Sequence, residues 1–205
     1  MKKIISYCLA FTFLAACSSG HKKIVVYIKG NTTVNEDAKT ITVSDGSGSD
    51  EKVISYKTAD KVQLQVKGLG DDAAVSIDDN GLYILNAKSD TIIGGYQKYS
   101  NPKTTQTVKT QDDLKHDIDS LVKLTENKNI SAANRNFYVL PKTAVKISDN
   151  VDAFVVGPFH RMTSIEKEGD KTPEVYRFYS IKEIRETIAK LTKLTVSKVI
   201  KPSDN

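Results

Sequence analysis

Short apolar runs separated by polar turns occupy residues 24 to 100 of the chain. In Val62–Val66 valine and leucine alternate with glutamine, and this alternation places every second side chain on one buried face of a β-strand. We expect strands at Ile24–Ile28, Thr40–Val43, Val53–Tyr56, Val62–Val66, Ala74–Ile77, Leu82–Leu85 and Thr91–Ile93. Several short strands in succession predict a β-sandwich or an open barrel.

Two stretches in this region predict turns. Asn80-Gly81 lies between two apolar runs, and this dipeptide favours the tight turn of a β-hairpin. The stretch Asp45–Glu51 is rich in glycine, serine and acidic residues, which predicts a mobile hairpin loop. Neither this stretch nor Asp71-Asp72 has the spacing of oxygen ligands that a twelve-residue calcium loop requires.

A helical pattern begins near Thr110, where Leu114, Ile118, Leu121 and Val122 share one face, and ends near Asn127. A second helix begins at Ser180, which forms a capping-box pattern with Glu183. The residues of its apolar stripe are Ile181, Ile184, Ile188, Leu191 and Leu194. Between the helices we expect strands at Phe137–Leu140, Ala144–Ile147, Ala153–Val156 and Glu174–Tyr179, the last paired with Met162–Glu166.

These elements predict an α+β fold. A β-rich part, sandwich-like or an open barrel, covers residues 24–104, and a smaller α+β part with two amphipathic helices covers residues 105–205. The two parts are separate domains or one continuous domain.

The N-terminus has the three parts of an export signal. Lys2 and Lys3 precede an apolar segment, Ile4–Ala16, which ends in small residues before Cys17. The segment is too short to span about 30 Å of hydrocarbon, which takes about 20 residues.

The sequence Leu14-Ala15-Ala16-Cys17 resembles the lipobox of bacterial lipoproteins. The resemblance implies that residues 1–16 are removed and that Cys17 carries a thioether-linked diacylglycerol and an acylated N-terminus. Residues 17–23 would then form a short lipidated tether to the bilayer. Because Ser18 rather than aspartate follows Cys17, the resemblance points to the outer membrane.

The cysteine content and the net charge exclude some kinds of functional site and argue against one class of partner. The chain has two cysteines; Cys8 lies in the predicted signal and Cys17 carries the predicted lipid, so the mature body has no free thiol. Disulfides, zinc–thiolate sites and cysteine nucleophiles are therefore excluded from that body. The net charge of +5 includes two signal lysines and is spread along the chain, which argues against a nucleic-acid partner.

The strongest candidate binding residues are His160 and Arg161, which follow Gly157-Pro158 at the end of a predicted strand. Such a pair can bind an anion or a carboxylate, although an ordinary surface loop is the simpler explanation, because no partner residue can be identified nearby in the sequence. In Tyr176–Tyr179, alternate residues point to opposite faces of a strand, which favours core packing over a ligand platform.

Metal and cofactor sites are not expected. Asp112, His116 and Asp119 share a helix face, but acidic residues near a helix N-terminus are already favoured by the helix dipole. The chain has no nucleophile elbow, zinc-protease pair, phosphate loop or dinucleotide fingerprint.

The sequence therefore predicts a lipid-anchored protein of the bacterial cell envelope. Its expected role is that of a non-catalytic binding or structural module acting on another envelope protein or polymer. The alternative is an envelope hydrolase that cleaves glycan or peptide through paired acidic residues.

Overall fold

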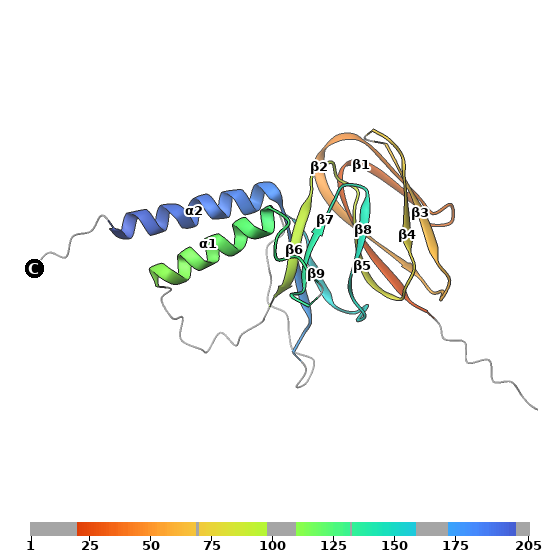
Figure 1. The fold of residues 1–205 in the computed structure, drawn as a ribbon. Coiled ribbons are helices and arrows are strands. Elements are labelled where there is room, and N and C mark those ends of the chain that lie inside the picture. The colour runs from red at the N-terminus through yellow and green to blue at the C-terminus, as the bar shows by residue number, and fades with distance from the viewer. Residues whose placement is uncertain (1–19, 69, 98–109, 132, 159–171, 200–205) are drawn as a thin grey trace, which may run out of the picture.

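The computed structural model describes residues 20–68, 70–97, 110–131, 133–158 and 172–199. Within these ranges the chain forms two β-sheets and two α-helices, which confirms the α+β class predicted from the sequence (Figure 1).

The first sheet has six strands in the order β4-β3-β2-β1-β5-β8. The strands are β1 (Lys22–Asn35), β2 (Thr40–Tyr56), β3 (Val62–Lys67), β4 (Ala73–Ile77), β5 (Gly81–Asn86) and β8 (Thr143–Ser148). The sheet curls until β4 and β8 approach each other, but it does not close into a barrel.

The second sheet has four strands in the order β7-β6-β10-β9. They are β7 (Asn136–Val139), β6 (Ile92–Gln97), β10 (Val175–Ser180) and β9 (Phe154–Val156). Each sheet contains strands from both predicted parts, residues 24–104 and residues 105–205. In the first sheet β5 pairs with β8, and in the second β6 pairs with both β7 and β10.

Two hydrophobic cores meet at β1. Ile24, Val26 and Ile28 point into the curled first sheet, where they pack among the apolar residues of β2 to β5. Val25 and Tyr27 point the other way, into a core shared with the second sheet. The apolar run of β1 is therefore unbroken because both faces of the strand are buried, as is typical of strands in parallel pairs such as β1 and β5.

The predicted hairpin at Asn80-Gly81 is wrong. The strands on either side of it do not pair, since β4 pairs with β3 and β5 lies between β1 and β8. Gly81 is still needed for its backbone, because its φ of 132° is one that side-chain-bearing residues rarely adopt. The turn therefore passes the chain from one edge of the sheet to its interior.

The predicted loop at Asp45–Glu51 is also wrong. These residues form the middle of β2, a strand of 17 residues that follows β1 along most of its length. The register between β1 and β2 shifts between Lys29 and Asn31, and residues 45–48 have no partner in β1 at this point. Ser49, Asp50 and Glu51 do pair with β1, and the extended backbone of β2 continues through the whole stretch. The expected strand Met162–Glu166 lies outside the described residues.

Both helices start at capping boxes. Thr110 and Asp113 cap α1 (Gln111–Thr125), and Ser180 and Glu183 cap α2 (Ile181–Val199), the second as predicted. The helices pack against each other in antiparallel orientation, with Gln111 near Thr195, and extend away from the sheets (Figure 1). The apolar stripe of α2 is buried at Ile184 near the sheet, whereas Leu194 farther along is 52% exposed.

Candidate functional site

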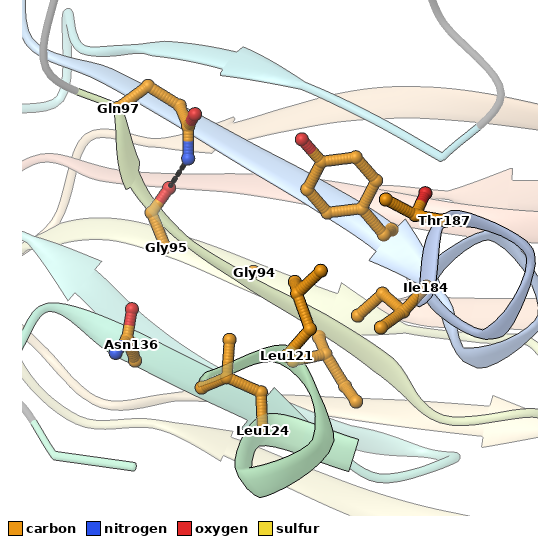
Figure 2. A pocket seen from close by; sticks show the side chains of 10 residues that line it. Gly94, Gly95, Gln97, Leu121, Leu124, Asn136, Ile184 and Thr187 are labelled. Atoms are coloured by element: carbon orange, nitrogen blue, oxygen red, sulfur yellow. Dashed lines mark hydrogen bonds between the residues drawn. The ribbon is translucent and has the colours of Figure 1, made fainter. Parts of the chain in front are cut away.

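A cavity of about 270 Å³ lies where the two helices meet the second sheet. Figure 2 shows Leu121 and Leu124 from α1 and Ile184 from α2 on one side of it, with Gly94 and Gly95 of β6 on the other. Among the residues that the structure describes, the lining consists of Ile93, Gly94, Gly95, Gln97, Leu121, Leu124, Asn136, Tyr179, Ile184 and Thr187. Five elements thus supply a wall made mainly of aliphatic side chains and backbone.

Two adjacent glycines of β6 lie in the floor of the cavity, and each leaves room for a neighbouring side chain on one face of the strand. A Cβ atom on Gly95 would lie 2.5 Å from Oδ1 of Asn136, so the missing side chain makes room for this amide. A Cβ atom on Gly94 would lie 2.5 Å from the ring of Phe178, so this glycine lets the core ring pack directly on the β6 backbone. Glycine inside a strand commonly marks such a close approach.

Neutral polar groups complete the lining. Gln97 donates a hydrogen bond of 3.4 Å to the carbonyl of Gly95, and Thr187 donates one of 2.9 Å to the carbonyl of Glu183. Burial raises the pKa of Tyr179, although the guanidinium of Arg177 over its ring opposes the shift. Tyr179 therefore stays uncharged, and the cavity suits a neutral, largely apolar group.

A polar network stabilises the second sheet beside this cavity. Oε1 of Glu174 accepts hydrogen bonds from the hydroxyls of Tyr176 (2.7 Å) and Ser148 (3.0 Å). The same oxygen forms an ion pair with the guanidinium of Arg135. Oε2 of Glu174 accepts a bond of 3.0 Å from Asn150. The guanidinium of Arg135 also lies 3.8 Å from the centroid of the Tyr96 ring, a cation–π contact.

The network lowers the pKa of Glu174. Burial alone would raise it, but hydrogen bonds from Tyr176, Asn150 and Ser148, together with the charge of Arg135, outweigh the burial. A carboxylate held ionised with both oxygens bonded is poorly suited to donate a proton to a substrate. Glu174 therefore serves the packing of the sheet.

The candidate residues named from the sequence lie in different parts of the structure. Tyr176 and Phe178 lie in the core between the sheets, whereas Tyr179 lines the cavity on the opposite face, which confirms the predicted alternation. Asp112, His116 and Asp119 are exposed, and no group of three or more metal-ligating side chains occurs in the described part of the chain. His160 and Arg161 lie outside the described residues, so their role stays a prediction.

No pattern in the sequence predicts the cavity. A local feature that marks it is Gly94-Gly95, which directly follows the predicted strand Thr91–Ile93 and lies in the middle of β6 (Ile92–Gln97). The remaining lining residues come from segments up to 94 positions apart, from Ile93 to Thr187, which only the tertiary structure brings together.

Comparison with known proteins gives no assignment: no family model, no curated protein and no solved structure matches the chain. Within the residues described, neither helix has the length and apolarity needed to cross a bilayer.

The network can be tested by removing one hydroxyl. Tyr176→Phe deletes the group that donates to Glu174 and accepts from Arg135 at 2.5 Å, and hydrogen bonds to charged groups contribute about 1.5–3 kcal/mol each. We expect urea unfolding to show a loss of about 2 kcal/mol.

Tyr27→Phe is the matched control. Tyr27 lies in the same core and is 2% exposed, but its hydroxyl has no hydrogen-bond partner among the described residues. Removing an unpaired buried hydroxyl should leave stability unchanged or raise it slightly. Equal losses in the two variants would contradict the role given to the network.

Proposed function

We propose that this protein is a lipid-anchored, non-catalytic binding module of the bacterial cell envelope. The cavity between the helices and the second sheet receives an apolar group of its partner. The observation that carries this proposal is the cavity itself, with aliphatic walls, a glycine floor and four neutral polar groups in its lining.

The size of the cavity points to the kind of partner. Ligand pockets for drug-sized molecules occupy roughly 300–1,000 Å³, and this one has about 270 Å³. It therefore suits one bulky side chain or a short aliphatic segment. An apolar lining matches a protein partner better than a glycan, because a glycan would leave hydroxyl groups buried without hydrogen bonds.

The lining also supports binding over chemistry. General acid–base catalysis uses groups that exchange protons near the working pH. Among the described lining residues the titratable side chain is Tyr179, whose pKa is raised by burial. An anchored binding module needs only a shaped surface and a fixed position.

The anchor can be tested by Cys17→Ser. Without the thiol the lipid cannot be attached, so the protein should move to the soluble fraction as a longer precursor that retains residues 1–16. Fractionation and immunoblotting of the envelope measure both effects. Tight membrane association of this variant would contradict the lipid anchor.

The cavity can be tested with an apolar dye, N-phenyl-1-naphthylamine, and the mature chain, residues 17–205, bearing Cys17→Ser. We expect saturable dye fluorescence and a loss of affinity of at least tenfold in Thr187→Trp, because the indole covers part of the cavity. Fluorescence titration in membrane-free buffer measures both.

Thr192→Trp provides a close control. Thr192 is also exposed on α2 and donates a bond of 2.8 Å to the carbonyl four residues earlier, as Thr187 does, but it does not line the cavity. Dye binding should survive in this variant. Equal loss in both, or no saturable binding at all, would exclude the cavity as the binding site.

A further inference from the structure

The chain is fixed to the fold from the first residues that the structure describes. The side chain of Lys22, at the start of β1, is fully buried, and its ammonium donates hydrogen bonds to three oxygens. These are the carbonyls of Thr58 (3.2 Å) and Ala59 (3.3 Å) and Oδ1 of Asn80 (3.2 Å). Since an ammonium has three donors, each finds an acceptor.

The two preceding residues contact the same segments. A Cβ atom on Gly20 would lie 2.5 Å from the carbonyl oxygen of Thr58 and 2.5 Å from Oδ1 of Asn80, so the Gly20 backbone packs directly against both. The carbonyl of His21 accepts a hydrogen bond of 2.9 Å from the amide of Gly81. Residues 57–61 and 78–80, which we call the basal turns, therefore hold residues 20–22 in place.

Covalent geometry then limits how far the body can be from a lipid on Cys17. Only Ser18 and Ser19 separate Cys17 from Gly20. Consecutive Cα atoms are about 3.8 Å apart, so the Cα of Cys17 lies within about 11 Å of the Cα of Gly20. The tether predicted from the sequence, residues 17–23, is thus shortened, because residues 20–23 belong to the fold.

We propose that the basal turns lie on the surface of the bilayer and that phospholipid headgroups are their partner. This inference depends on the proposed lipid anchor at Cys17. The short connection and the contacts of Lys22 together hold the protein in one orientation, with the basal turns against the membrane.

The charges of the basal turns fit zwitterionic headgroups. Exposed side chains of both signs lie in this region: the lysines Lys57 and Lys61, and the aspartates Asp60, Asp78 and Asp79. Lys61 and Asp78 form an exposed ion pair of 3.1 Å, which phosphate and amine groups of lipids can approach from either side. Contact is imposed by the covalent anchor and does not require a strongly basic face.

This orientation places the helices away from the lipid. In Figure 1 the N-terminal end of β1 and the α1–α2 pair lie at opposite sides of the molecule, with the second sheet between the first sheet and the helices. The cavity is thereby presented toward a partner at a distance from the membrane.

The orientation can be measured with single labelled cysteines. Once Cys17 is lipidated, the mature chain has no free thiol, so Lys57→Cys or Lys193→Cys accepts a maleimide fluorophore at one position. Both lysines are exposed; the first lies in a basal turn and the second on α2. The lipidated proteins are reconstituted in phosphatidylcholine vesicles that carry a spin label on the headgroup.

We expect fluorescence quenching at position 57 at least threefold greater than at position 193. Quenching that is equal at the two positions, or greater at 193, would overturn the proposed orientation. Vesicle flotation is measured first, because a protein that does not float with the vesicles disproves the anchor itself. A protein that floats but shows equal quenching disproves only the orientation.

Lengthening the connection is the second test. An insertion of about ten Gly/Ser residues between Ser19 and Gly20 adds a reach of about 17 Å on average and leaves every described residue unchanged. Quenching at position 57 should then fall toward the value at position 193. Unchanged quenching would show that the short connection does not set the orientation and would overturn this inference.

Discussion

The burial of β1 on both faces is the constraint on which the rest of the structure depends. Ile24, Val26 and Ile28 close the core of the curled first sheet, while Val25 and Tyr27 form one wall of the core between the sheets. Each buried aliphatic or aromatic side chain of this kind contributes about 1.5–3 kcal/mol. A single strand therefore couples two cores that would otherwise fold around separate sets of residues.

The same strand connects this packing to the predicted anchor. Lys22 at its start is held by three oxygens of the basal turns, and Cys17, the predicted site of the lipid, stands five residues earlier. The predicted anchor is thus connected directly to a strand that is buried on both faces from Ile24 to Ile28. The Glu174 network links Tyr176 of β10 to Ser148 at the end of β8 and to Asn150, and the second sheet lines the cavity.

Local signals in the sequence were sufficient for the elements but not for their partners. The capping box at Ser180 and Glu183 and the apolar stripes of both helices depend on residues three and four apart, so they could be predicted. The Asn80-Gly81 turn was also a local signal, but the pairing of β5 with β1 depends on which buried strand accepts it, and residues 22–27 are far away in sequence. The Asp45–Glu51 stretch was predicted as a loop for a similar reason: local composition does not show that residues 49–51 pair with β1 or that residues 45–48 lie in a register shift of a continuing strand. The cavity is lined by residues of five elements, and Gly94-Gly95 was the only local feature of the sequence at its position.

Intact-mass analysis of the protein extracted from its native membrane decides whether the folded body is held on the bilayer through a lipid on Cys17. We expect a chain that begins at Cys17 and carries the added mass of a diacylglyceryl group and an N-linked acyl chain. A chain that retains residues 1–16, or that begins at an unmodified Cys17, would contradict it.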